Sequence, residues 1–378
     1  MCVTIDRASK RCPGSSIGER PPRLPHARTS FMTSENGERG GDSNRSSSPA
    51  LDLVRRPRHT WRSQAKETPY DRRMTTISVV GVPSSAGSYA AGQEQAPAVL
   101  RSAGLIDSLR ASGLDVGDEG DLPLQVWRPD RINPRAQNVD QVTESVQDLI
   151  ECLTPLFVRG DTLLVLGGNC TVVLGVVAAL RRVSVDPVGV FYMDRNYDLN
   201  TPESTSDGAL DWMGMAHALS LPGSLDVLVD VLGPRPLLEP DQVAWLGIDD
   251  RFATEWERAE ARRLGLQVIS SSALAQAPVS SAVESLKHLP SGPLAVHLDV
   301  DVLDFTDAPL AENTDGRNSG PTLDHAAGAL RIAAQDARFR SLSIGELNPT
   351  RSAGDPETIP RLIASLIGIM GGASELAT

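Results

Sequence analysis

The chain has 378 residues, of which 40% are apolar and 22% charged, and its formal net charge is −12. This length and apolar content are sufficient for the core of one large α/β domain. The acidic charge argues against a nucleic-acid-binding protein and favours a cationic ligand. No segment approaches the ~18 consecutive apolar residues that a membrane span requires. The four cysteines, Cys2 and Cys12 among them, form no disulfide framework, so we expect a protein of the reducing cytoplasm.

The first 73 residues differ in composition from the rest of the chain. They contain 15 Lys or Arg against 8 Asp or Glu, a charge of +7, which leaves −19 for residues 74–378. They are rich in Ser, Pro and Arg and have no periodic apolar residues, so they cannot bury enough surface to offset their chain entropy. They also lack the apolar core of a signal peptide. We therefore predict a disordered basic extension over residues 1–73 and a folded domain over residues 74–378.

In the folded domain, short apolar runs alternate with segments of helical periodicity, which is typical of a parallel sheet covered by helices on both faces. The predicted strands are Ile77–Val82, Leu114–Gly117, Thr162–Leu166, Val188–Asp194, Val243–Ile248, Leu266–Ile269, Leu294–Asp299 and Ser341–Glu346. The predicted helices are Ala96–Ala111, Gln137–Val158, Val172–Val183, Ala253–Leu264, Ser280–His288, Leu323–Gln335 and Glu357–Ile369. This order predicts a three-layer α/β/α domain with an eight-stranded, mainly parallel sheet.

Four aspartates follow two of these strands. Asp194 and Asp198 come at the end of the fourth predicted strand, and Asp299 and Asp301 at the end of the seventh. The carboxyl ends of the strands in an open α/β sheet lead to the ligand crevice, so the two pairs could converge on one site. Clustered carboxylates raise each other's pKa unless they are compensated. A hard divalent cation such as Mn, Mg or Ca is the usual compensation, and two such pairs in one chain favour a metal site over solvated loops.

Five motifs surround these aspartates in a fixed order: Gly81-Val-Pro-Ser-Ser-Ala-Gly87, Leu166-Gly-Gly-Asn-Cys-Thr171, Asp194-Arg-Asn-Tyr-Asp-Leu-Asn-Thr-Pro202, Asp299-Val-Asp-Val-Leu-Asp304 and Glu346-Leu-Asn-Pro349. With this order and spacing, from about Ile77 to Gly372, the chain resembles the ureohydrolases. This is the arginase and agmatinase family of dimanganese enzymes that release urea from guanidino compounds. The resemblance implies an arginase-like fold, two Mn²⁺ sites, a small guanidino substrate and a homo-oligomer, trimeric or hexameric.

The resemblance also implies a role for each aspartate. Asp194 and Asp299 match the ligands that bridge the two metals, Asp198 matches a ligand of one metal, and Asp301 matches a ligand of the other. All four carboxylates are present in this chain. The sequence therefore retains the whole acidic part of the family's metal site.

Both metal-binding histidines of the family are replaced. Cys170 stands at the position of the histidine in the family's Gly-Gly-Asp-His motif. Asn196 stands at the position of the histidine in its Asp-Ala-His-x-Asp motif. None of the remaining histidines of the folded domain falls at a ligand position. His297, two residues before Asp299, is expected to be a core histidine with satisfied hydrogen bonds.

These replacements leave three interpretations. In the first, metals still bind, because the Asn196 amide oxygen is a hard donor and Cys170 can ligate as a thiolate. Thiolate is a soft ligand, so the site would favour Zn or Fe, or would hold one metal weakly. In the second, the guanidinium of Arg195 enters the cluster and replaces a cation as a bidentate partner of a carboxylate. In the third, the chain binds no metal and catalyses nothing. The presence of all four aspartates favours the first.

The remaining matches concern the substrate. Glu346 falls where the family has a carboxylate that binds the substrate guanidinium. A buried carboxylate suits this role because it pairs with a planar cation in fork geometry. Asn200 and Thr205 match positions that contact the amino-acid head group. Asp207 replaces a common serine and would repel an α-carboxylate, and Asp211 falls where a histidine shuttles protons. We predict a metal-dependent hydrolase that releases urea or hydroxyurea from arginine, hydroxyarginine or a related compound. The alternative is a catalytically silent relative that binds a ligand or another subunit.

Overall fold

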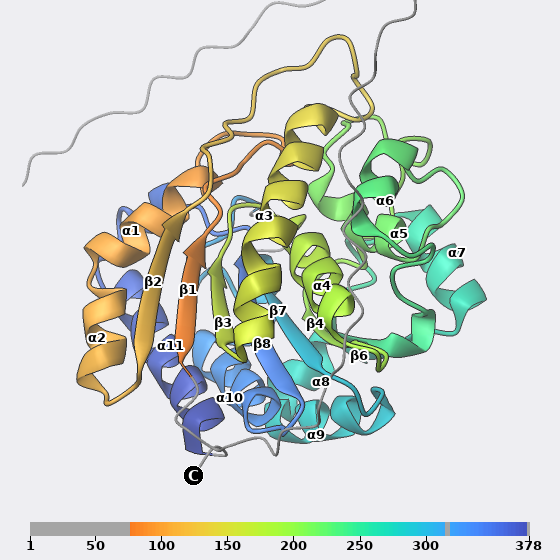
Figure 1. Cartoon of the computed structure of the whole chain (residues 1–378). Coiled ribbons are helices and arrows are strands. Elements are labelled where there is room, and N and C mark those ends of the chain that lie inside the picture. The colour runs from red at the N-terminus through yellow and green to blue at the C-terminus, as the bar shows by residue number, and fades with distance from the viewer. Residues whose placement is uncertain (1–75, 314–317, 376–378) are drawn as a thin grey trace, which may run out of the picture. The chain divides into compact units, whose positions relative to one another are not determined.

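The structure is a computed structural model that describes residues 76–313 and 318–375 (Figure 1). These residues belong to one compact unit. The extension predicted over residues 1–73 lies outside the described residues. Among the helices of the described part, none has both the length and the apolar character that a membrane crossing requires.

The centre of this unit is one eight-stranded sheet with the order β2-β1-β3-β8-β7-β4-β5-β6. Every strand pairing in it is parallel. The strands are β1 (Ile77–Gly81), β2 (Val116–Asp121), β3 (Thr162–Leu166), β4 (Gly189–Met193), β5 (Val243–Ile248), β6 (Gln267–Ser270), β7 (Leu294–Asp299) and β8 (Phe339–Gly345). All eight predicted strands are thus confirmed, with ends shifted by a few residues. The central strands read as continuous apolar runs because both of their faces are buried.

Helices cover both faces of the sheet (Figure 1). They are α1 (Ala96–Ser102), α2 (Leu105–Ala111), α3 (Val139–Arg159), α4 (Val172–Val183), α5 (Gly214–Ala218), α6 (Asp226–Leu232), α7 (Glu255–Leu264), α8 (Ser271–Gln276), α9 (Pro278–His288), α10 (Leu323–Ala334) and α11 (Thr358–Glu375). Helices α3 to α6 pack on the face that holds Val80 and Val165. Helices α1, α2 and α8 to α11 pack on the face that holds Val79 and Leu164. Successive residues of a strand therefore point into two different hydrophobic cores, one on each face of the sheet, as the three-layer prediction requires.

The structure corrects the predicted helices in two ways. The single helix predicted over Ala96–Ala111 is two helices, because Gly104 between them adopts a left-handed backbone with φ of 89°. The sequence analysis also missed α5, α6 and α8, which have five to seven residues each. Fewer than two helical turns give too few apolar repeats for a periodicity to be recognised.

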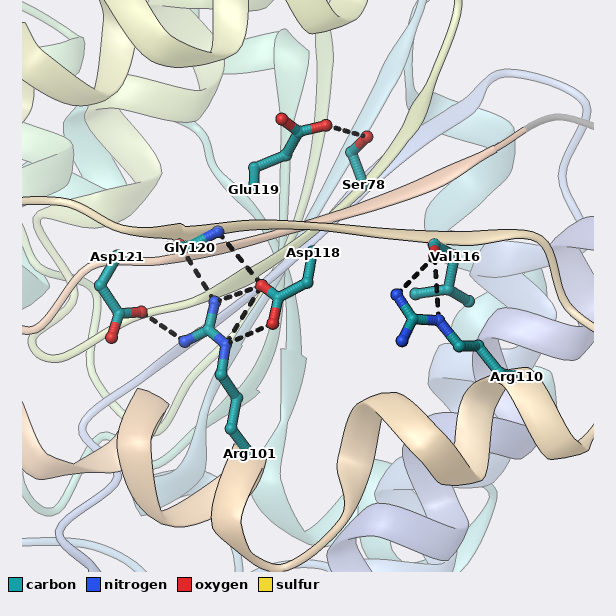
Figure 2. Close-up of polar contacts among 8 residues, drawn as sticks. All are labelled: Ser78, Arg101, Arg110, Val116, Asp118, Glu119, Gly120 and Asp121. Carbon is teal, nitrogen blue, oxygen red and sulfur yellow. Dashed lines mark hydrogen bonds and ion pairs between the residues drawn. The ribbon is translucent and has the colours of Figure 1, made fainter.

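The edge strand β2 is strongly acidic, and its carboxylates form hydrogen bonds and ion pairs with neighbouring side chains. Arg101 of α1 donates to both carboxylate oxygens of Asp118, at 3.0 Å from Nε and 2.9 Å from Nη2, and also binds Asp121 (Figure 2). Glu119 accepts from Ser78 of the neighbouring strand and from Arg159. Charged side chains on an edge strand disfavour pairing with a further strand. Part of the chain's acidity is therefore structural and does not concern the site described next.

Candidate active site

The candidate site lies at the carboxyl ends of four neighbouring strands, β3, β8, β7 and β4. The strand register places Leu166, Ile344, Leu298 and Met193 side by side across the sheet. The residues that follow each of them therefore meet at one edge, as expected for a parallel sheet. Nine of the predicted site residues come together there: Cys170, Asp194, Asn196, Asp198, Asp207, Asp211, Asp299, Asp301 and Glu346.

A cavity of about 470 Å³ opens at this edge. Its described lining includes Cys170, Asn196, six of the predicted acidic residues of the strand ends and loops, and a group of residues that the sequence analysis did not single out. The predicted members are Cys170, Asn196, Asp198, Asp207, Asp211, Asp299, Asp301 and Glu346, and the additional ones include Tyr89, Trp212, Glu312 and Arg351. The cavity is thus predominantly acidic, and it is large enough for a small cationic molecule.

Three side chains form a compact donor set for a metal ion. Ligand atoms of Cys170, Asp194 and Asp299 all lie within 4.8 Å of one another, and all three residues are buried. The Cys170 thiol donates to Asp299 Oδ2 at 3.0 Å. Asp194 Oδ2 and Asp301 Oδ1 are buried and have no hydrogen-bond partner among the described residues. Buried polar atoms are almost always satisfied, so unpartnered carboxylate oxygens in such a cluster fit a cation.

The same local turn orients both strand-end aspartates. The Asn196 backbone N–H donates to Asp194 Oδ1 at 2.6 Å, and the Asp301 backbone N–H donates to Asp299 Oδ1 at 2.7 Å. In each case the acceptor lies two residues before the donor, which is the Asx-turn pattern that Asp favours. The turn fixes one oxygen of each carboxylate and leaves the other oxygen for the shared space beside Cys170.

Two other acids occupy strained backbone positions. Asp198 has a φ of 55° and Glu346 a φ of 61°, in the left-handed region that residues other than glycine rarely adopt. Asp198 accepts from the Tyr192 hydroxyl. Glu346 Oε1 accepts from the Cys170 backbone N–H at 3.3 Å, and Oε2 accepts from the Gln93 side chain. Such strain persists only where the surroundings hold it, and it concentrates at functional sites.

Burial raises the pKa of these acids well above their ordinary range, and the neighbouring carboxylates raise it further. This holds for Asp194, Asp198, Asp299 and Glu346. The pKa of the Cys170 thiol is raised for the same two reasons, burial first and then Asp299 and the other acids. Without a cation the cluster therefore retains protons. A bound cation would displace those protons, because it stabilises the charged form of each ligand.

Asp211, at the start of a 3-10 turn over Asp211–Met213, lines the cavity and has a pKa raised to about 7. Burial is the main cause, the charge of Asp207 adds to it, and the backbone N–H of Trp212 opposes it. An acid whose pKa lies near neutrality can both take up and release a proton at physiological pH. This property suits the proton-shuttling role that the sequence analysis predicted for Asp211.

The raised pKa of Asp211 gives a pH-dependent stability with a defined sign. Between about pH 4 and about pH 7 the folded chain keeps a proton that the unfolded chain has lost, so this contribution to stability falls as the pH rises. In the metal-free chain, Asp211→Asn should remove this decrease in stability with rising pH. Its free energy of unfolding relative to the parent should increase by roughly 2 kcal/mol between about pH 5 and about pH 8. Urea unfolding of both proteins at the two pH values measures it, and a constant difference would show that Asp211 does not titrate there.

Of the three residues predicted to contact the substrate head group, the structure brings only Asp207 to the cavity. Asn200 is fully buried, and its Oδ1 accepts from Ser204 Oγ at 3.0 Å and from Thr254 Oγ1 at 2.8 Å. Thr205 donates to Asp207 Oδ1 at 3.3 Å and is not among the described lining residues. The Asn200 Oδ1 and Thr205 Oγ1 atoms thus hydrogen-bond within the protein, on the loop that carries Asp207, although Asn200 Nδ2 has no partner among the described residues.

His297 is the core histidine that the sequence analysis expected, and it also contacts the site. It is fully buried, its Nδ1 lies 2.9 Å from Ser343 Oγ, and its Nε2 lies 3.3 Å from Cys170 Sγ. Its ring stacks on Tyr192 with the centroids 5.1 Å apart. Burial lowers the pKa of His297 to about 3, so the ring is neutral. The spacing of two residues between His297 and Asp299 indicated that they share one face of their strand. The contact with Cys170 could not be read from this spacing, because Cys170 follows a different strand.

Arg195 lies inside the cluster. It is buried, its Nη2 is 3.4 Å from Asp301 Oδ2, and its guanidinium lies over the Phe252 ring at 4.7 Å. The Asn196 side chain also reaches Asp301, with Nδ2 at 3.3 Å from the same oxygen. The second of the three interpretations is therefore correct in placing Arg195 in the cluster, but the contact with Asp301 is made through one nitrogen and is not bidentate.

The thiol at position 170 predicts a weak manganese site. Mn²⁺ prefers harder ligands than thiolate, and this thiol must first lose a proton that burial retains. Cys170→His should therefore tighten Mn²⁺ binding by about tenfold or more and reduce the preference for Zn²⁺. Competition titrations with the two metals measure it. Cys152→Ala, which removes the half-buried cysteine of α3, should change neither affinity. Equal Mn²⁺ affinity in Cys170→His and its parent would remove Cys170 from the ligand set.

Comparisons with known proteins agree with this architecture. The sequence profile of the arginase family matches residues 75–369. The arginase of Bacillus caldovelox is 29% identical over 243 residues, which cover 62% of this chain and 79% of that protein. Human arginase-1 is 27% identical over 299 residues, which cover 78% of this chain and 91% of that protein. The native structure of the Bacillus caldovelox arginase superimposes with a TM-score of 0.69 at 25% identity and covers 79% of this chain and 98% of that one.

Proposed function

Because the chain belongs to the arginase family, we propose that it is a cation-dependent hydrolase that releases urea or hydroxyurea from a linear guanidino compound. The observation that carries this proposal is the buried acidic cluster with its unpartnered oxygens, Asp194 Oδ2 and Asp301 Oδ1, beside a cavity of about 470 Å³. Such a cluster needs positive charge from a ligand, and the site's geometry offers room for a metal ion and for a substrate cation.

The metal ligands would come from both strand ends. Cys170, Asp194, Asp198 and Asp299 would hold one ion, and Asn196 and Asp301 match the ligands of a second. Mn²⁺ is the ion expected from the resemblance. A bound divalent cation lowers the pKa of a water molecule and so provides an attacking group at neutral pH.

Glu346 would bind the guanidinium of the substrate. Its two oxygens are already held by the Gln93 side chain and by the backbone N–H of Cys170, so the carboxylate is oriented before the substrate arrives. A fixed carboxylate can accept two N–H groups of a planar guanidinium. Since Glu346 also lines the cavity next to Asp299, it would place the guanidinium carbon beside the metal ligands.

The reaction is a hydrolysis. The oxygen of water bonds to the guanidinium carbon, the bond from that carbon to the substituted nitrogen breaks, and the products are urea and an amine. The leaving amine requires a proton. Asp211, with a pKa near 7 and a position on the cavity wall, would relay the proton from the attacking water to the amine.

The outer part of the cavity bears on the choice of substrate. Asp207 is exposed there, and Glu312 is paired with Arg351, whose Nε lies 3.3 Å from Glu312 Oε2. The positive charge of Arg351 is thus already balanced, and Asp207 would repel a carboxylate. A guanidino compound with an amine or neutral tail fits this wall better than free arginine does.

The test is product formation by the full chain. Metal-free protein is supplied with excess Mn²⁺ and offered arginine, hydroxyarginine, agmatine and shorter guanidino acids, and urea or hydroxyurea is measured. We expect turnover of at least one compound, with agmatine preferred to arginine by about tenfold, which is about 1.4 kcal/mol. Absence of product from every compound at full metal occupancy would contradict the proposal and would favour the catalytically silent alternative.

A further inference from the structure

We propose that the site holds one divalent cation per chain, and that the guanidinium of Arg195 takes the place of the second cation that the resemblance implies. This inference rests on the proposed function of the same site. It follows from a difference between the two halves of the cluster, the half around Cys170 and the half around Asp301.

The half around Cys170 is arranged for a metal ion. Ligand atoms from Cys170, Asp194 and Asp299 lie within 4.8 Å of one another, and Asp194 Oδ2, in a residue with no exposed surface, has no partner among the described residues. The only donor from this set that points at a carboxylate is the Cys170 thiol, whose proton a metal would replace. One ion can therefore enter this half without displacing any other side chain.

The half around Asp301 is already occupied by donors. Arg195 Nη2 at 3.4 Å and Asn196 Nδ2 at 3.3 Å both approach Asp301 Oδ2. The Asn196 amide donates through its nitrogen, so its oxygen, the atom that could ligate a metal, is turned away from Asp301 Oδ2. Asp301 Oδ1 has no hydrogen-bond partner among the described residues, but a metal that used Asp301 Oδ2 and Asn196 as ligands would have to displace both donors and rotate the amide. Positive charge and N–H groups thus take the space of the second ion.

The protein holds Arg195 in this position from the other side. The guanidinium lies over the Phe252 ring at 4.7 Å, and the Arg195 carbonyl accepts from the Asp249 backbone N–H at 2.9 Å. The residue is 5% exposed. A guanidinium stays charged at all physiological pH values and stacks well on aromatic rings, so it acts as a permanent cation here.

The two replacements in Asp194-Arg-Asn-Tyr-Asp198 have a common consequence. Relative to the family pattern Asp-Ala-His-x-Asp, Asn196 removes a metal ligand and the adjacent Arg195 supplies a cation, and both side chains reach the same oxygen of Asp301. Loss of the ligand alone would leave Asp301 uncompensated in a buried cluster, which is costly. The neighbouring arginine offsets that cost.

The experiment is a measurement of metal stoichiometry. The metal-free full chain is saturated with Mn²⁺, unbound metal is removed, and bound metal is counted by elemental analysis while electron paramagnetic resonance reports the spectrum. We expect one Mn²⁺ per chain with the resolved hyperfine lines of an isolated ion. Arg195→Ala combined with Asn196→His should bind two, and the lines should be lost through coupling between neighbouring ions.

Two matched variants separate the role of Arg195 from general disturbance. Asn196→His alone restores the ligand but keeps the guanidinium, and it should still bind one ion. Arg251→Ala removes the other arginine that lies over Phe252, at 5.5 Å, but this arginine pairs with Asp249 and not with the cluster. It should also bind one ion. Circular dichroism confirms that each variant is folded.

The possible outcomes are distinct. Two ions in the parent chain, or two in Asn196→His alone, would overturn the inference, as would one ion in the Arg195→Ala, Asn196→His variant. No bound metal in the parent would overturn both this inference and the proposed function. One bound ion together with no hydrolysis of any guanidino compound would contradict the proposed function alone and leave the assignment of Arg195 standing.

Discussion

Asp299→Asn is expected to lower the rate of urea release by about a thousandfold and to remove most bound metal. Asp299 Oδ2 lies 3.0 Å from Cys170 Sγ, at the centre of the donor set, and its Oδ1 is fixed by the Asp301 backbone N–H. Asparagine keeps the volume and that backbone contact, but it removes the negative charge. The measurement is Mn²⁺ content and urea release on the same preparation.

The same variant separates loss of function from loss of fold. In the metal-free chain, burial and the charge of Asp301 raise the pKa of the Asp299 carboxyl group. Asp299→Asn removes that group, so the free energy of unfolding at neutral pH should stay equal or increase. Asp324→Asn, an exposed acid on α10, is the matched control and should change neither metal content nor rate. A folded Asp299→Asn protein with normal metal content and normal turnover would contradict the assignment of Asp299.

Glu346→Gln should lower kcat/KM by about a hundredfold and leave bound metal unchanged. The glutamine cannot supply the charge that a guanidinium requires, and one of its two terminal groups becomes a donor that opposes Gln93 or the Cys170 backbone N–H. Because this contact both captures the guanidinium and orients its carbon for attack, we expect KM to rise and kcat to fall. Steady-state kinetics with the best substrate of the panel measure both.

The control for Glu346→Gln is Glu357→Gln, which neutralises an exposed acid just before α11. It should behave as the parent. If Glu346→Gln loses metal while its substrate affinity is unchanged, Glu346 belongs to the metal site. If it changes neither quantity, Glu346 has only the structural role that its contacts with Gln93 and Cys170 already show.

The sheet could be predicted from the sequence because its strands are buried on both faces and read as apolar runs. Segments such as Thr162–Leu166 and Val243–Ile248 match the structure at both ends. The helix break at Gly104 and the short helix Gly214–Ala218 could not be predicted, since they depend on one backbone conformation and on tertiary packing. Local patterns identify long elements and miss short ones.

The convergence of the strand-end acids could also be predicted, because parallel strands direct their carboxyl ends to one edge. The environment of each side chain could not be predicted from the sequence. The contact between His297 and Cys170 requires β7 and the loop after β3 to lie on either side of β8, a matter of strand order. The burial of Asn200 depends on Thr254, more than fifty residues away. Sequence spacing contains neither relationship.

Turnover in water enriched in oxygen-18 tests the central claim most directly. If the chain is a hydrolase that uses water to attack the guanidinium carbon, then urea released from the best substrate must carry the heavy oxygen, and mass spectrometry of the product will show it. Urea without the label would show that its oxygen does not come from water. No urea under saturating Mn²⁺ would show that this member of the arginase family keeps the fold and the acidic cluster without the reaction.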